Sequence, residues 1–121
     1  MSFGPPEYLR HILAEADFLL HASQGVSAEA FARDPILQVA FVRSLEVIGE
    51  ATKKLPTSYR EDHPEVEWRA MAGMRDHLIH GYFAVDYQLV WDVVTTKIPG
   101  STSKSRGFSR QRHRDGVLTW S

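Results

Sequence analysis

The sequence predicts an all-α fold, a four- to five-helix up-and-down bundle that ends in a disordered basic C-terminal tail. Apolar residues recur every three or four positions through most of residues 1–99, and no segment shows the sustained period-two alternation of a half-buried strand. The chain is 121 residues long, which suits one hydrophobic core. It has no cysteine, which excludes a disulfide framework, thiolate metal sites and cysteine nucleophiles.

Two helices are expected before residue 35. Apolar residues recur at helical spacing over about residues 6–21, and Gly25 ends this first helix because glycine is a poor helix former. A short helix over residues 27–31 follows. Ser27 suits its N-cap, since the hydroxyl can accept a hydrogen bond from a backbone N–H of the first turn.

A long third helix is expected over residues 35–55. Pro35 suits its first turn, where the missing N–H costs nothing, and Pro56 ends it. One face of this helix carries an apolar stripe, and charged residues share another face. The stretch over residues 57–64 is polar and turn-like, with room for one helical turn.

Two more helices complete the expected bundle. The fourth spans about residues 65–79, and Gly81 is placed to stop it. The fifth spans residues 86–97, with Asp86 as its N-cap and Pro99 beyond its end.

Charge is distributed unevenly along the chain. The formal net charge is −1, but residues 1–97 carry nine basic and fourteen acidic side chains, whereas residues 98–121 carry five basic and one acidic. The mildly acidic body argues against a broad nucleic-acid-binding face, so any RNA contact there must be local. Residues 100–116 are polar and almost free of aliphatic side chains, so we expect residues 100–121 to form a disordered tail after a helical domain at residues 1–99.

The sequence also indicates where the protein acts. It contains no run of about 18 apolar residues, the length needed to span a membrane. The first ten residues are proline-rich and include Glu7, so we expect no signal peptide and a cytoplasmic location.

Residues 74–82 form the densest polar cluster in an otherwise apolar helix, and they include Arg75, His80 and Tyr82. An arginine offers a planar fork of donors suited to phosphate, and histidine is the side-chain type whose ordinary pKa lies near neutrality. Together they could cleave a phosphodiester without a metal. His80 would move the proton of a ribose 2′-hydroxyl or of the leaving oxygen, and Arg75 would neutralise charge on the phosphate oxygens.

Helical geometry complicates this interpretation. On one straight helix Arg75 and His80 lie about 140° apart. Either the helix deforms before Gly81, or a second chain completes the site across a two-fold axis. From composition alone, the ordinary alternative of capping, salt-bridge and packing residues stays open.

A metal site is a weaker interpretation of the same cluster. Asp76, His77 and His80 have helical spacing, but the sequence contains neither a zinc-helix motif nor any Glu-x-x-His. No glycine-rich phosphate loop follows a strand either. We therefore expect no metal and no other cofactor.

The arrangement of Arg75, four residues, His80, one residue and Tyr82 resembles the Arg-x4-His-x-Tyr motif of HEPN-domain ribonucleases. Residues 43–51 and 73–86 resemble the third-helix and active-site signatures of one branch, the HepT toxins of HepT–MntA toxin–antitoxin pairs. The resemblance covers about residues 7–99. The chain departs from the family pattern at Ser44, where Asn is frequent, at Glu67, where Pro is usual, and after Pro99, where the family continues with an apolar helical end.

The resemblance implies a HEPN-like homodimer whose two motifs face a cleft at the dimer interface. It implies a metal-independent endoribonuclease that acts on RNA through Arg75 and His80. It also implies that an MntA-like nucleotidyltransferase antitoxin silences the toxin by transferring AMP to Tyr82. The alternative is a catalytically weak or inactive HEPN homodimer that serves as a binding module for a nucleotidyltransferase partner or a nucleotide.

Four further charged residues are candidates for support of this cleft: Arg43, Glu46, Glu50 and Asp76. The first three lie on the third helix, where spacings of three and four residues are typical of a salt-bridged surface stripe. The resemblance implies instead that they line the cleft and orient Arg75 or His80.

Overall fold

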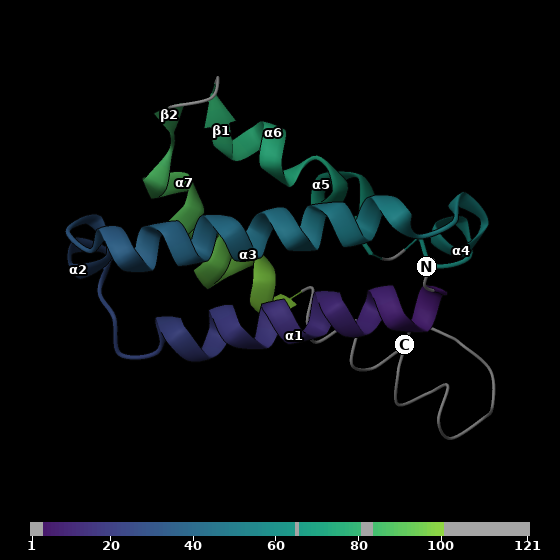
Figure 1. Cartoon of the computed structure of the whole chain (residues 1–121), viewed down its shortest axis with the longest axis horizontal. Coiled ribbons are helices and arrows are strands. Elements are labelled where there is room, and N and C mark those ends of the chain that lie inside the picture. The colour runs from purple at the N-terminus through teal and green to yellow at the C-terminus, as the bar shows by residue number, and fades with distance from the viewer. Residues whose placement is uncertain (1–3, 65, 81–83, 101–121) are drawn as a thin grey trace.

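The computed structural model describes residues 4–64, 66–80 and 84–100 of the chain. Most of these residues are helical, which confirms the expected all-α class (Figure 1). The elements in chain order are α1 (Pro5–Ser23), α2 (Ala28–Ala32), α3 (Pro35–Lys54), α4 (Thr57–Glu61), α5 (Trp68–Ala72), α6 (Met74–Leu78), β1 (Ile79–His80), β2 (Ala84–Val85), α7 (Tyr87–Asp92) and the π-helical η1 (Val93–Lys97).

The two long helices α1 and α3 lie side by side and antiparallel (Figure 1). The short helices α5 and α6 pack along the opposite side of α3, and α7 and η1 cross behind it. Fully buried side chains from several helices form one core. Helix α3 contributes Phe41, Leu45 and Ile48 to its centre. Ser44, at the position where Asn is frequent, is also buried and donates a hydrogen bond of 2.8 Å to the Glu15 carboxylate on α1.

The helix boundaries follow local signals in the sequence. The predicted caps are confirmed, because the Ser27 hydroxyl accepts from the Ala30 N–H at 3.0 Å and the Asp86 carboxylate accepts from the Leu89 N–H at 3.0 Å. Gly25 has a φ of 74°, a left-handed conformation that suits the end of a helix and favours glycine.

The predicted fourth helix is divided in the structure. It begins at Trp68 rather than near residue 65, breaks at Gly73 between α5 and α6, and ends at Leu78, one residue before the predicted end. Residues 79 and 80 are instead extended and pair antiparallel with residues 85 and 84. The Asp86 N–H donates to the Leu78 carbonyl at 3.0 Å, so the returning chain takes an acceptor that the next helical turn would have used.

The fifth helix widens before it ends. The Ile98 N–H donates to the carbonyl of Val93, five residues earlier, and the helical path continues to Gly100 rather than ending before Pro99. A proline ring collides with the carbonyl four residues earlier in a regular helix. The wide turn therefore lies where Pro99 would otherwise distort the helix.

Two further expectations concern the C-terminal tail and the absence of a membrane-spanning helix. The tail predicted at residues 100–121 lies, apart from Gly100, outside the described residues. Within the described ranges, no helix combines the length and the apolar composition that crossing a membrane requires.

Candidate functional site

Arg75 on α6 meets Glu46 on α3. The Arg75 Nε lies 3.5 Å from a Glu46 carboxylate oxygen, and the two side chains are 50% and 29% exposed. A second contact joins the Arg75 guanidinium to Asp76 at 3.9 Å, but the Asp76 side chain is 77% exposed. Glu46 is therefore the partner that can hold Arg75, because it is the more buried carboxylate and lies on a long helix.

Packing beneath α5 and α6 sets the position of Arg75. Met71, Met74 and Leu78 are buried in the core, and the Trp68 indole N–H donates to the His63 carbonyl at 2.8 Å. Helix α5 approaches α3 closely at Gly49, where an added Cβ would lie 3.4 Å from the Met71 carbonyl oxygen. This close contact places α6 beside the middle of α3, within reach of Glu46.

The other two motif residues follow directly after α6. The chain leaves the helical path at Leu78, so His80 lies in β1 and is not constrained to a helical angle from Arg75. The helix thus deforms before Gly81, one of the two routes that the 140° separation left open. The side chain of His80 and the whole of Tyr82 lie outside the described residues.

In the described part of the chain, neither Arg43 nor Glu50 forms an ion pair with Arg75. They line a groove of about 280 Å³ between α1 and α3, together with Tyr8, His11, Val47, Ala51 and Lys54. Glu50 forms an ion pair of 3.5 Å with Lys53. Of the four supporting residues, the structure therefore brings Glu46 and Asp76 to Arg75 and places the other two in a neighbouring groove.

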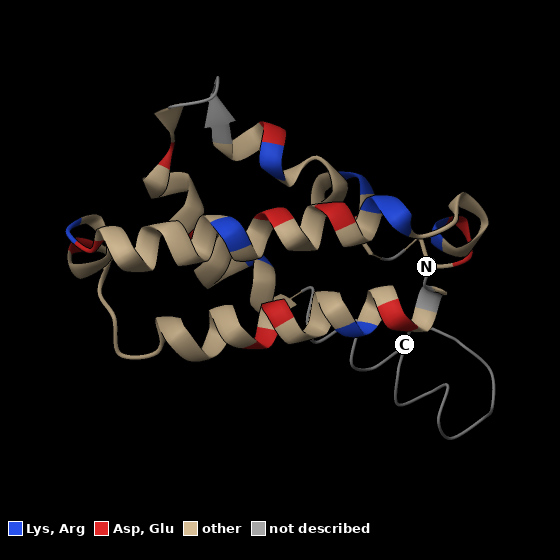
Figure 2. Ribbon diagram, viewed as in Figure 1, with Lys and Arg blue, Asp and Glu red and all other residues tan. Residues whose placement is uncertain are grey.

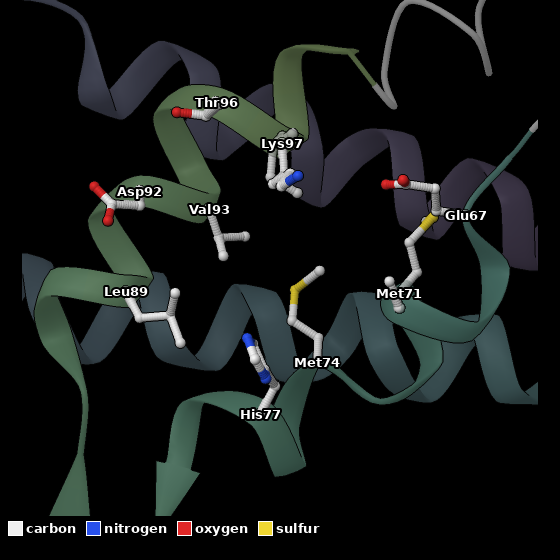
Figure 3. Close-up of a pocket in the computed structure, with 11 residues that line it drawn as sticks. Glu67, Met71, Met74, His77, Leu89, Asp92, Val93, Thr96 and Lys97 are labelled. Atoms are coloured by element: carbon white, nitrogen blue, oxygen red, sulfur yellow. The ribbon is translucent and has the colours of Figure 1, made fainter.

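His77 lines a second, larger cavity on the other side of α6. Arg75 and His77 are two residues apart, which separates them by about 200° on a helix. The cavity has a volume of about 470 Å³, and Figure 3 shows the His77 ring pointing into it beside Met74 and Leu89. The sequence analysis did not find this cavity, because its walls come from α5, α6, α7 and η1 and no short motif marks it.

Among the residues that the structure describes, no three His, Asp or Glu side chains come together in a way that could hold a metal ion. The chemistry available at the described site is that of a cation held by a carboxylate. Such a half-exposed guanidinium can bind an oxyanion.

The chain is similar in sequence to one family and to several named proteins. A model of the family described as "Ribonuclease HepT-like" matches residues 11–105. A protein of Caldanaerobacter subterraneus subsp. tengcongensis, named "Putative RNase", is 53% identical over 95 residues, which are 78% of this chain and 85% of the relative. A protein of Thermococcus cleftensis, named "Probable ribonuclease HepT", is 40% identical over 98 residues, or 81% of this chain and 89% of the relative.

A third relative, from Methanocaldococcus jannaschii and also named "Putative RNase", is 40% identical over 92 residues, which are 76% of each chain. No solved structure gives a significant match. The family match spans both α3, which carries Glu46, and the Arg75 motif after it. The chain belongs to the HepT-like ribonuclease family.

Proposed function

We propose that this protein is the toxin of a HepT–MntA-type pair and an endoribonuclease that cuts RNA without a metal ion. Arg75 and His80 are its catalytic residues, and Tyr82 is the position at which a nucleotidyltransferase antitoxin silences it by adding AMP. The observation that carries the proposal is the ion pair between Arg75 and Glu46, which holds a half-exposed guanidinium five residues before His80.

Arg75 binds the phosphate in this proposal. The guanidinium has five N–H donors, and Glu46 approaches it through the Nε atom. The two terminal nitrogens are then available to bind two phosphate oxygens, once the long contact to exposed Asp76 gives way. Negative charge that builds on the phosphate oxygens during cleavage is neutralised there.

His80 moves the proton. Its backbone lies in β1, next to the helix that carries Arg75, and histidine is the residue type suited to proton transfer near neutral pH. It takes the proton of the attacking 2′-hydroxyl or gives one to the leaving oxygen, and Arg75 itself transfers none.

The toxin acts as a homodimer, and α3 offers a surface for it. Ile36 and Val39 are 84% and 65% exposed, which is unusual for large apolar side chains so close together. Both lie within about 80° of Arg43 and Glu46 around the helix axis. A second copy that packs on Ile36 and Val39 would bring its own motif toward the same cleft.

Expression in bacteria tests the proposal. The wild-type chain should arrest growth, and Arg75→Ala and His80→Ala should not, at equal protein levels. Co-expression with a cognate MntA-like nucleotidyltransferase should restore growth and add the mass of one AMP to the tryptic peptide that contains Tyr82.

Tyr82→Phe is the matched variant, because it removes only the acceptor hydroxyl. It should arrest growth and resist the antitoxin. Growth arrest by the His80→Ala variant would contradict the catalytic assignment. Neutralisation of Tyr82→Phe by the antitoxin would contradict the AMP transfer and leave the binding-module alternative.

A further inference from the structure

We propose that the groove between α1 and α3 binds the substrate RNA beside the cut, with Arg43 and Lys54 contacting backbone phosphates. This inference rests on the proposed ribonuclease function and adds a binding site to it. The groove has a volume of about 280 Å³ and lies where the two long helices run side by side (Figure 1).

The first argument for this site is the charge of the groove. Arg43 and Lys54 are exposed, and neither has an ion-pair partner within the part of the chain that the structure describes. Glu50, the carboxylate among the lining residues, is paired with Lys53 at 3.5 Å. Two cations are thus left without an acidic partner on a body whose net charge is negative, and an anion is the ligand that they suit.

The second argument is the spacing of the two cations and the apolar surface between them. Arg43 and Lys54 are eleven residues apart on one helix, which separates them by about 16 Å along its axis. Between them Tyr8, Val47 and Ala51 supply aromatic and aliphatic surface. Cations spaced along a groove with an aromatic side chain in its wall are typical of sites that follow a single-stranded nucleic acid, because phosphates meet the charges while bases and sugars meet the apolar surface.

The third argument is the position of the groove relative to Arg75. Arg43 lies one helical turn, or about 4.5 Å along the axis, before Glu46, which holds Arg75. A strand whose cleaved phosphate sits at Arg75 therefore has neighbouring phosphates within reach of Arg43, and Lys54 lies further along the same helix. Figure 2 shows charged bands on the half of α3 nearer α4, whereas the half nearer α2 is uncharged.

That division separates RNA binding from dimer contact. The exposed large apolar residues of α3 are Ile36 and Val39, in its first two turns, and the groove begins only at Arg43. A second copy seated on the apolar turns leaves the charged half of the helix open to RNA.

The salt dependence of RNA binding tests the inference. Binding of a fluorescent 12-nucleotide single-stranded RNA is measured by anisotropy on the full chain with His80→Ala, so that no cleavage occurs. Loss of two phosphate contacts in Arg43→Ala/Lys54→Ala should reduce the slope of log K against log salt by about 1.4. Binding should then be about 25-fold weaker at 0.1 M salt, if both proteins bind alike at 1 M.

A matched control removes the same charge elsewhere. Arg10 and Arg33 are exposed and lie outside the groove lining, and Arg10 forms a surface pair with Glu7 at 3.7 Å. Arg10→Ala/Arg33→Ala should keep the parent slope. An equal loss of slope in this control would show a general charge effect and overturn the inference, as would an unchanged slope in the groove variant or no RNA binding by the parent.

Two further readouts separate the inference from other roles of the groove. With His80 intact, the groove variant should show a raised KM for the 12-nucleotide RNA, whereas Arg10→Ala/Arg33→Ala should keep the wild-type KM. If the groove variant instead loses its dimer or its binding to the nucleotidyltransferase with an unchanged salt slope, the groove is a protein contact and the inference is wrong. If RNA binds through the groove but the wild-type chain, with His80 intact, never cuts it, the proposed function fails and the inference stands.

Discussion

Replacing Glu46 by glutamine tests whether the ion pair positions Arg75 for the phosphate. Glu46→Gln keeps the shape of the side chain and removes the charge that lies 3.5 Å from the Arg75 Nε. The variant should fold normally, because a pair that is 50% and 29% exposed contributes only about 0.2–1 kcal/mol to stability. Its effect should appear in the rate of RNA cleavage instead.

The size of that effect follows from the freedom that Arg75 regains. Holding one long side chain in a single orientation costs about 0.5–1.5 kcal/mol, which the carboxylate offsets before the substrate arrives. Without the pair, the bound phosphate has to order Arg75 itself. The rate of cleavage under kcat/KM conditions should therefore fall by about 2- to 13-fold.

A single-turnover cleavage assay on a short RNA measures this change. Glu61→Gln is the control, because it removes one exposed carboxylate from α4, away from Arg75. A double-mutant cycle with Arg75→Ala should show that Glu46→Gln has no further effect once the guanidinium is gone. A faster Glu46→Gln enzyme would refute the reasoning, since it would mean that the carboxylate keeps Arg75 away from the phosphate.

Three other outcomes test the fold and the assembly. Phe41→Ala should lower the free energy of unfolding by about 3–5 kcal/mol in urea denaturation, because Phe41 is fully buried and its ring centroid lies 5.1 Å from that of Phe31. A loss below about 1 kcal/mol would place Phe41 outside the core. Trp68→Phe should lower the free energy of unfolding by about 0.5–1.5 kcal/mol in the same assay, because the His63 carbonyl loses the indole N–H and keeps only the Val66 N–H at 3.3 Å; an unaffected variant would show that the indole hydrogen bond adds no stability. Val39→Asp should convert a homodimer to a monomer in sedimentation velocity, and a variant that stays dimeric would move the interface away from the start of α3.

Sequence reasoning worked where a local signal decides the structure. The caps at Ser27 and Asp86 depend on one side chain and a backbone N–H three residues away, so a short window of sequence contains the whole interaction. Pro35 and Pro56 likewise bound the long helix through their own rings. These positions were predictable because no distant contact competes with them.

The end of α6 depends on distant contacts instead. Residues up to 79 have helical periodicity, yet the chain turns extended after Leu78 because residues 84–86 return to pair with it. The break at Gly73 coincides with the close approach of α5 to α3 at Gly49. Tertiary packing overrides the local preference at both places, and a window around either one does not contain the partner.

The same distinction applies to the site. Glu46 and Arg75 were both candidates from the sequence, but they are 29 residues apart in the chain. Their contact forms only when α6 packs on α3. The groove that Arg43 and Glu50 line has one wall on α1, which carries no part of either signature. Which charged residue meets which partner therefore required the fold.

The pH dependence of RNA cleavage in the presence of EDTA tests the central claim most directly. The claim predicts that the wild-type protein cuts without added metal, with a limb of the rate profile that titrates near neutrality. Arg75→Ala should lower the rate by about 10²–10³-fold and keep the shape of the profile, because it removes a charge stabiliser and no proton carrier. His80→Ala should abolish the neutral limb. Undiminished cleavage by either variant, or activity that appears only with a divalent metal, would contradict the claim.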